Sequence, residues 1–577
     1  MLAKREFDSI LRQIDGHQPS EYSKLAGDFD FTRFVLHNIN IPSFESEPCE
    51  SLFVIHVPQM IAGFPESIYD SPIRRTALED FLTRKMDDAI QCVSHRQASG
   101  LAECRISIAR PGQEILPRSS MVIARDYVEA RIMVRLPVVL GKIAADEARI
   151  LFLDYLPEIV NSSLIYCYLN SKELLRFVSL MEDADTIRHD LQSRGMVSFA
   201  ATGSKLNRHL GTDLPSQDGA RLEVASELEV EVSTPNAGRV RGLTIPVGVT
   251  LIIGDNYSGR SELINALAAG IYNHIPNDGR EQVISVPDAV HIVAESGRSI
   301  QKVDISPFLL TSRTGESTKE FSSSCATPAE SQMAGVTEAL HVGAQALFFD
   351  ESSSDPTFLA MDSRVTRLSD TWGGGMASLS DRARQIADDL RVSVVVGACA
   401  CAAEFIPIAD TILLIDNYRV VDITKKAREL DLAKSTRFPR CDLPTPNDSY
   451  RWVIPSSLDP SLGREEAVIQ TNGRLQLLFG RHIVDLSAVP QIADVHQTLA
   501  IGWLLYHAKL YHLDDCRTVS EILDLLDKDL ATDGMDAITR DLRGDLARPR
   551  RFEIAAALNR LNTLRVMAQS PFENAKR

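Results

Sequence analysis

The feature that most constrains the fold of this chain is a strand, loop and helix pattern in residues 248–267. A β-branched apolar run ends at Gly254, a turn follows, and a helical pattern with one apolar face begins at Ser261. Gly254 and Gly259 are separated by four residues and are followed by a base and Ser261, which is the spacing of a P-loop. The base is Arg260, at the position where a lysine is expected.

The loop itself supplies the residues that we predict to bind a nucleotide. In a P-loop, backbone N–H groups and the N-terminus of the following helix surround the phosphates. The predicted binding residues are Gly254, Asp255, Asn256, Tyr257, Ser258, Gly259, Arg260, Ser261 and Glu262. The alternative is a glycine-containing turn between a strand and a helix, and Arg260 in place of lysine keeps this alternative open.

A second chemical feature is an acidic pair at the end of an apolar run. Phosphoryl hydrolysis needs a phosphate cradle, a magnesium ligand and a group that orients water. Asp350 is predicted to hold Mg²⁺ through water beside Ser261, and Glu351 is predicted to face the attacking water as the catalytic base. We expect the two acids to end the strand next to the first core strand. The alternative is an ordinary turn at a strand end.

The rest of the middle region alternates between strands and helices. Apolar runs at 346–349, 392–396 and 411–415 are typical of buried parallel strands, and helical patterns at 330–343 and 380–390 lie between them. A P-loop followed by this alternation predicts a doubly wound α/β core. Upstream, 228–232 and 243–253 read as two further strands.

Composition and charge limit the classes of function. The 577 residues carry a formal charge of −17, which argues against a chain coated with nucleic acid or anionic membrane. No window reaches the roughly 18 apolar residues that a membrane helix needs, and the charged N-terminus precedes no apolar core. The nine cysteines form no CxxC pair. We therefore expect a cytoplasmic or nuclear protein with no membrane contact.

Any nucleic-acid site must be local, and the most basic region is near the C-terminus. It contains Arg543, Arg548, Arg550, Arg551, Arg560 and Arg565. Two interpretations are equally open: a solvated helical face with ion pairs, or a patch that contacts RNA. Phe552 is the only aromatic residue there, which gives little support for base stacking.

Several long strings carry a resemblance to a known family. They include 248–281, 294–298, 303–308, 347–351 and, near the C-terminus, 550–561. These strings resemble the ATPases of the ABC class over nearly the whole chain. The resemblance implies an α+β N-terminal domain in 1–180, a P-loop ABC-type ATPase core in 181–445 and a small, mostly helical C-terminal domain in 446–577. It also implies ATP and Mg²⁺ as ligands, and some relatives are linked to RNA. Hydrolysis at a composite site would need a face-to-face homodimer, which belongs to the first hypothesis below.

The chain departs from the family pattern at its phosphate loop. Family members resemble Gly-Gly-Gly-Tyr-His-Gly-Lys-Ser-Thr there. Arg260 keeps the positive charge of the lysine, but a broad planar guanidinium is no equivalent for a narrow ammonium between phosphates. Asp255 and Glu262 place carboxylates beside a polyanion, and each such pair at about 4 Å costs roughly 1 kcal/mol even at the dielectric constant of water. The affinity for ATP should therefore fall.

Two further departures affect hydrolysis. Where the family presents a Ser-Gly-Ser-Thr-Ser-Gln helix start, residues 327–332 predict a helix capped by its own Thr327 and Glu330, with Pro328 first in the helix. The loop at 397–402 lacks the histidine that many ABC ATPases place near the γ-phosphate. There, Cys399 and Cys401 are best interpreted as small residues packed at a strand end.

Two hypotheses follow from the sequence. The first is an ABC-class ATPase that binds Mg-ATP and hydrolyses it slowly as a dimer, with Glu351 as the base. The second is a pseudo-ATPase, with or without bound nucleotide, that acts as an interaction scaffold and holds RNA through its C-terminal arginines. The retained acids at 350 and 351 favour the first hypothesis, and the departures at 260, 262, 328 and 330 favour the second.

Overall fold

The computed structural model describes most of the chain and divides it into two compact units. The described residues are 2–40, 50–97, 106–216, 219–311, 315, 317–362, 375–430, 438–445, 451–514 and 516–567. Unit 1 comprises Met1–Glu182 and Asp533–Arg548, and unit 2 comprises Asp183–Thr532 and Pro549–Arg577. The predicted boundary at residues 445 and 446 adjoins a segment outside the described residues.

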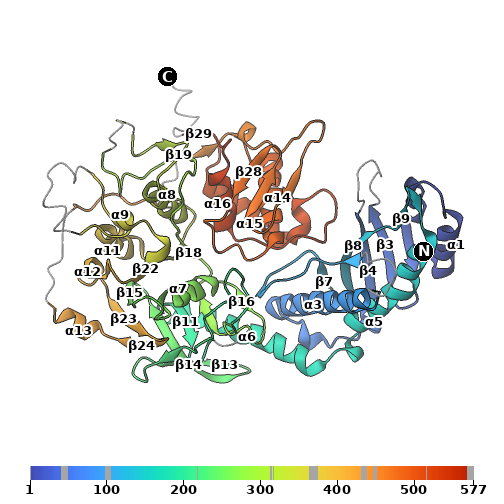
Figure 1. The fold of residues 1–577 in the computed structure, drawn as a ribbon, viewed down its shortest axis with the longest axis horizontal. Coiled ribbons are helices and arrows are strands. Elements are labelled where there is room, and N and C mark those ends of the chain that lie inside the picture. The colour runs from blue at the N-terminus through green and yellow to red at the C-terminus, as the bar shows by residue number, and fades with distance from the viewer. Residues whose placement is uncertain are drawn as a thin grey trace. The chain divides into compact units, whose positions relative to one another are not determined.

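Unit 1 is built on a mostly antiparallel sheet with long helices beside it (Figure 1). The two longest strands pair along their whole length and are largely buried, as expected for apolar β-branched sequence. In sheet order the strands are β1 (Leu2–Ala3), β2 (Gly27–Asp30), β3 (Val35–Asn40), β4 (Glu50–Pro58), β8 (Tyr127–Arg135) and β5 (Ile106–Ser107), with β7 (Met121–Ile123) also on β8. The helices beside them are α1 (Lys4–Gln13), α3 (Pro72–Gln97) and α5 (Leu156–Leu164).

Unit 2 contains the predicted α/β core as a seven-stranded sheet. Four of its strand pairs are parallel: β15 with β22, β15 with β23, β21 with β22, and β18 with β21. These pairs include all three strands predicted from the apolar runs, which confirms them. The strand order is β12 (Glu223–Val224), β24 (Arg419–Asp422), β23 (Thr411–Asp416), β15 (Val249–Ile253), β22 (Ser393–Ala398), β21 (Ala346–Asp350) and β18 (Ala289–His291). Helices α8 (Pro328–His341) and α11 (Leu379–Leu390) lie at the predicted places.

The sheet order corrects one expectation about the acidic pair. We predicted that Asp350 and Glu351 end the strand next to β15, and this is wrong because β22 lies between β15 and β21. Chain order does not give strand order in a doubly wound sheet, so sequence alone could not place β22. The acids still reach the P-loop because parallel strands end at the same edge of the sheet.

The predicted strand 243–253 is two strands in two sheets. β14 (Gly238–Pro246) belongs to a separate antiparallel sheet, and the break before β15 falls at Gly248, which has φ of +108°. A Cβ on Gly248 would lie 2.4 Å from a carboxylate oxygen of Asp410. Only glycine fits this left-handed, crowded position, and Pro246 and Gly248 are the sequence signals of the break.

A smaller antiparallel sheet stands beside the core. Its strand order is β13 (Val230–Thr234), β14, β11 (Met196–Ala201) and β17 (Val283–Ser285), and helix α6 (Ser171–Ser193) leads into β11. Helix α7 (Arg260–Ala269) contacts strands of both sheets, among them β17, β21 and β22. The helix that follows the P-loop is thus held on two sides.

The C-terminal part of unit 2 combines helices with a three-stranded sheet that composition did not predict. The helices are α14 (Val495–Tyr511), α15 (Val519–Thr532) and α16 (Arg551–Arg560), and the strands are β26 (Ile469–Thr471), β27 (Gln476–Phe479) and β28 (His482–Asp485). Helix α14 packs on β26 and β27, and α16 contacts α8 of the core. Figure 1 shows this part in orange and red.

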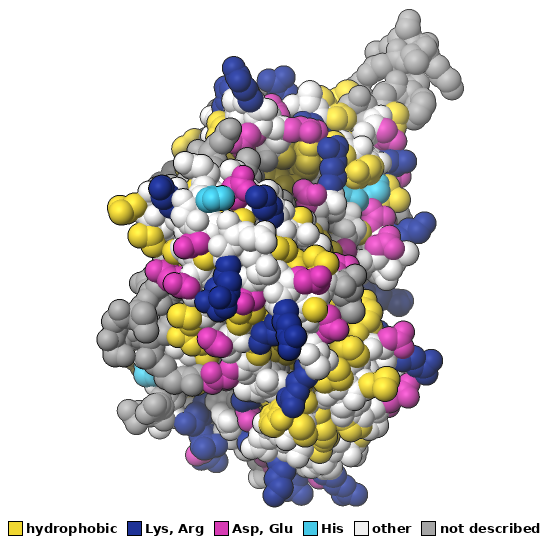
Figure 2. Space-filling view, turned by 90° about the vertical axis from the view of Figure 1, so that its right-hand side faces the viewer, with side chains coloured by type: hydrophobic (Ala, Val, Ile, Leu, Met, Phe, Trp, Pro, Cys, Tyr) yellow, Lys and Arg dark blue, Asp and Glu magenta, His cyan; other side chains and the backbone are white. Residues whose placement is uncertain are grey.

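The surface carries side chains of both charges (Figure 2), and none of the described helices is suited to cross a membrane. On the face drawn in Figure 2, Lys and Arg side chains lie among Asp and Glu side chains. Among the described residues, no helix has the length and apolar character to span a bilayer.

Candidate functional site

The loop between β15 and α7 has the backbone shape of an anion nest. Tyr257 and Gly259 have φ of +66° and +96°, so the loop turns its N–H groups in a way that an all-right-handed turn cannot. Gly259 is the N-cap of α7 and makes no side-chain capping bond. The amides at the start of α7 are therefore not satisfied by a side-chain cap, which is the arrangement that binds phosphate.

The side chains of the loop divide into exposed and buried groups. Asp255, Asn256 and Tyr257 are exposed, and an oxygen of Asp255 accepts the N–H of Asn256 at 2.7 Å. Ser258 is buried, and a Cβ on Gly254 would come within 2.4 Å of its hydroxyl oxygen. Ser261 and Glu262 are partly buried in the first turn of α7. The predicted loop residues are therefore brought together, with one carboxylate already on a loop amide.

Arg260 is directed toward the acidic pair. Its side chain is 8% exposed, its Nη1 donates to the carbonyl oxygen of Gly254 at 2.8 Å, and its Nε lies 3.4 Å from Oδ1 of Asp350. The same Nη1 is 3.7 Å from Oε2 of Glu351. The planar guanidinium thus joins the start of the P-loop to both acids, a set of contacts that a single ammonium could not reproduce.

Glu351 is held by the loop that follows β22. Its carboxylate accepts hydrogen bonds from the backbone N–H groups of Cys399, Ala400 and Cys401 at 2.6, 3.2 and 3.0 Å. The cysteines act here through their backbone, and burial together with the charge of Glu351 raises the pKa of the Cys401 thiol. The Glu351 carboxylate is therefore already engaged by three backbone donors, with a guanidinium beside it.

Three buried polar atoms at this point have no hydrogen-bond partner among the described residues. They are the hydroxyl of Ser258, Nε of Arg260 and Oδ1 of Asp350. Two of them, Nε of Arg260 and Oδ1 of Asp350, face each other at 3.4 Å as an ion pair without hydrogen-bond geometry, so they remain available for stronger partners. The loop and helix start fit the phosphates of a nucleotide. The acid Asp350 fits a magnesium shell only after Arg260 moves away from it.

Tyr418 supports the loop and was missed by sequence reasoning. It lies in the turn between β23 and β24, and its backbone N–H donates to the carbonyl oxygen of Ser258 at 2.8 Å. A Cβ on Gly259 would come within 2.7 Å of its ring, so the ring packs directly on the loop. The only local sequence signal of this turn was Asn417, because asparagine favours turns. In the structure both Asn417 and Tyr418 have left-handed φ values.

The start of α8 is capped as predicted. The hydroxyl of Thr327 accepts the N–H of Glu330 at 3.3 Å, and a carboxylate oxygen of Glu330 accepts the N–H of Thr327 at 2.9 Å. Pro328 is the first helical residue. The helix therefore satisfies part of its own N-terminus, which reduces what it can offer to a partner's phosphate.

This cap gives a prediction for stability. Thr327→Ala should lower the free energy of unfolding by about 1 kcal/mol, because it leaves the N–H of Glu330 without its acceptor. Urea unfolding of the variant and of Ser324→Ala, an exposed control three residues earlier, would measure the difference. Equal losses in the two variants would show that the cap contributes nothing.

Most of the C-terminal arginines are engaged within the chain. Each of the following pairs lies within one unit: Arg550 with Glu553 at 2.6 Å, Arg560 with Glu295 at 2.9 Å, Arg551 with Asp524 at 2.7 Å and Arg543 with Asp545 at 2.6 Å. Phe552 is buried. These contacts favour the ion-pair interpretation of the basic region over a patch of free cations.

Comparisons with known proteins agree with this architecture. Three family models match: the P-loop domain of the ABC ATPase family at 170–441, the N-terminal domain of the ATPases of the ABC class at 4–167, and the MRB1590 C-terminal domain at 468–567. The uncharacterized protein MJ1628 of Methanocaldococcus jannaschii is 31% identical over 108 residues, which cover 17% of this chain and 24% of that protein. The match thus spans about a quarter of that relative.

Among solved structures, cbiO1 from Clostridium perfringens, part of the ABC transporter complex cbiONQ, is similar over 41% of this chain and 92% of that chain. The identity is 11% and the TM-score is 0.26. The family models carry more weight, since the first two follow one another along the sequence and together span most of it. The two consecutive family models, over a chain with a P-loop and an α/β core, lead to one conclusion: the chain belongs to the ATPases of the ABC class.

Proposed function

We propose that this chain binds ATP with Mg²⁺ at residues 254–262 and hydrolyses it slowly. The observation that carries the proposal is the loop with left-handed Tyr257 and Gly259 that opens into a helix without a side-chain cap. A loop of this shape binds phosphate through backbone donors, and these donors are present whichever residue occupies position 260.

The metal part of the proposed site uses two side chains. Ser261 and Asp350 would hold the ion, which, when bound, neutralises charge on the phosphates. The guanidinium of Arg260 lies 3.4 Å from Oδ1 of Asp350, so it must withdraw before that oxygen can face a hydrated cation. Binding of Mg-ATP is therefore coupled to the release of an internal ion pair.

Two features support slow rather than fast hydrolysis. The carboxylate of the proposed base Glu351 already accepts three backbone hydrogen bonds, so its oxygens are held by the loop after β22 and must be released before they can orient a water molecule. In the proposed homodimer, a partner's phosphate would meet α8 at an N-terminus that Thr327 and Glu330 already cap. Both catalytic contributions are weakened without loss of the phosphate loop.

A second candidate is a pseudo-ATPase that serves as an interaction scaffold. The observation that favours it is the set of contacts that joins Arg260 to Gly254, Asp350 and Glu351, because these contacts satisfy the centre of the site without a nucleotide. In that case the ATP-dependent steps are absent and the core only presents surfaces to partners.

Labelled ATP separates the two candidates. Wild-type protein should retain ATP in the presence of Mg²⁺ and release phosphate slowly, and Glu351→Gln should retain ATP but release phosphate at least about tenfold more slowly. A full general base is worth about 10²-fold to 10⁴-fold, and the engaged carboxylate should give less.

Glu223→Gln is a matched control, since Glu223 is exposed at the edge strand β12 of the same sheet. The same background release by wild type and Glu351→Gln would end the hydrolysis proposal. Failure of the wild type to retain ATP would end the binding proposal and leave the scaffold.

A further inference from the structure

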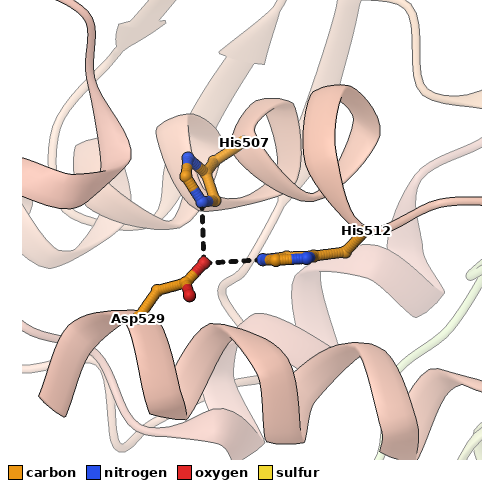
Figure 3. Close-up of side chains that lie close together, drawn as sticks. All are labelled: His507, His512 and Asp529. Carbon is orange, nitrogen blue, oxygen red and sulfur yellow. Dashed lines mark hydrogen bonds and ion pairs between the residues drawn. The ribbon is translucent and has the colours of Figure 1, made fainter. Parts of the chain in front are cut away.

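A group of two histidines and one aspartate converges in the C-terminal part of unit 2 (Figure 3). Nε2 of His507 lies 2.9 Å and Nε2 of His512 lies 2.6 Å from the same oxygen, Oδ2 of Asp529. The ligand atoms of all three residues lie within 4.8 Å of one another, and no other group of three such residues meets this condition in the described ranges.

The fold, not helical periodicity, brings these side chains together. Residues five apart on a straight α-helix point about 140° away from each other. His507 lies in the last part of α14, but α14 ends at Tyr511 and His512 follows it as the C-cap residue, with φ of −119° and ψ of −19°. Asp529 comes from the neighbouring helix α15. Helix α14, the C-cap of α14 and helix α15 thus contribute one ligand atom each.

We propose that His507, His512 and Asp529 bind one divalent transition-metal ion, with Zn²⁺ as the ion that suits them best. Imidazole nitrogen and carboxylate oxygen are zinc ligands, at about 2.0–2.1 and 2.0–2.2 Å. Ligand atoms at the corners of such a tetrahedron lie roughly 3.3 Å apart. The observed separations of 2.6 and 2.9 Å therefore need to open by roughly 0.7 and 0.4 Å, which small side-chain rotations can supply.

The surroundings suit a cation with one open position. The imidazoles of His507 and His512 are only 9% and 12% exposed, so their orientation is fixed by packing. The carboxylate of Asp529 is 31% exposed, which leaves room for a water molecule as the fourth ligand, as in zinc sites with three protein ligands. Burial raises the pKa of Asp529, but hydrogen bonds from both histidines outweigh burial and keep the carboxyl below its ordinary value.

The alternative is a hydrogen-bonded triad that never holds metal. In that case each imidazole donates an N–H to Asp529 and the triad only ties α14 to α15. Glutamine at positions 507 and 512 distinguishes the two, because its side-chain amide can still donate to the carboxylate but is a poor metal ligand. The substitutions thus preserve the tie and remove the site.

The test is a zinc titration of the full chain against a competing chelator. Wild type should bind one Zn²⁺ per chain, and the double variant His507→Gln with His512→Gln should bind at least about 100-fold more weakly, since even the outer partners of metal ligands cost about 10-fold to 100-fold. His189→Gln, at an exposed histidine of α6, is the control and should bind as wild type does. Thermal unfolding without metal checks that the variants fold, and added Zn²⁺ should raise the midpoint of wild type and control only.

The free thiols require a second measurement, because several described cysteines are exposed and thiolates also bind zinc. Co²⁺ bound to histidine and carboxylate gives no near-ultraviolet charge-transfer band from thiolate, and we expect none. Equal binding by wild type and the double variant, a thiolate band, or no stoichiometric zinc in wild type would each overturn the proposal.

Discussion

Replacing Arg260 by lysine is expected to tighten ATP binding by roughly 10-fold to 100-fold. In the wild type, ATP has to displace a guanidinium that donates to the carbonyl of Gly254 and lies beside two carboxylates. Hydrogen bonds to charged groups contribute about 1.5–3 kcal/mol, and 1.4 kcal/mol corresponds to a factor of ten. Lysine lacks the planar fork that makes these contacts together, so less is lost when the nucleotide enters.

Calorimetric titration with ATP and Mg²⁺ would measure this effect. Arg239→Lys is the matched control, because Arg239 is an exposed arginine on β14 and its replacement should leave the dissociation constant unchanged. Weaker binding by Arg260→Lys would mean that the guanidinium itself holds phosphate, and either weaker or unchanged binding would show that the idea of a displaceable internal ion pair is wrong.

Replacing Arg550 by methionine is expected to lower the free energy of unfolding of unit 2 by about 3–5 kcal/mol. The side chain of Arg550 is 14% exposed and pairs with Glu553, which is 1% exposed. Its Nη1 also donates to the backbone oxygens of Pro287 and Ala289, which tie α16 to the core. Removal of one partner of a buried pair leaves the other charge buried alone, and that carries this cost.

Arg551→Met, one residue further along, is the control for this prediction. Arg551 pairs with Asp524, which is 63% exposed, so its loss should cost no more than about 1 kcal/mol. Denaturant unfolding followed by tryptophan fluorescence would compare the two, since Trp452 and Trp503 both belong to unit 2. If Arg550→Met also cost no more than about 1 kcal/mol, Arg550 would be an ordinary surface arginine. That result would favour the RNA interpretation of this region.

Much of the core could be predicted from the sequence because buried parallel strands are continuous apolar runs. The runs at 346–349, 392–396 and 411–415 became β21, β22 and β23, and the helix after the P-loop begins within one residue of its predicted start. The cap of α8 followed from Thr327 and Glu330 alone, since a capping box depends on residues three positions apart.

The site could be predicted only as a set of residues. Whether the Arg260 guanidinium points toward phosphate or toward Asp350 depends on contacts between two segments about 90 residues apart in the chain, and local pattern holds no information on them. The same is true of Glu351, because its donors come from the loop after β22. His507, His512 and Asp529 were not predicted, since a helix end brings the histidines together rather than a metal-ligand spacing.

Residues 533–548 belong to unit 1, although they follow most of unit 2 in the sequence, and this affects the order in which the units fold during synthesis. Arg131 of β8 donates to Asp536 at 2.7 Å and to the backbone oxygen of Arg543 at 3.0 Å. A strand that is synthesised early therefore forms these bonds only after residues near the C-terminus have been synthesised. On the ribosome, the first unit therefore lacks these bonds until almost all of the second has been synthesised. A nascent chain that ends before Asp536 would leave the guanidinium of Arg131, which is 4% exposed in the folded protein, without two of its partners, so we expect unit 1 to complete its folding only after these residues are made.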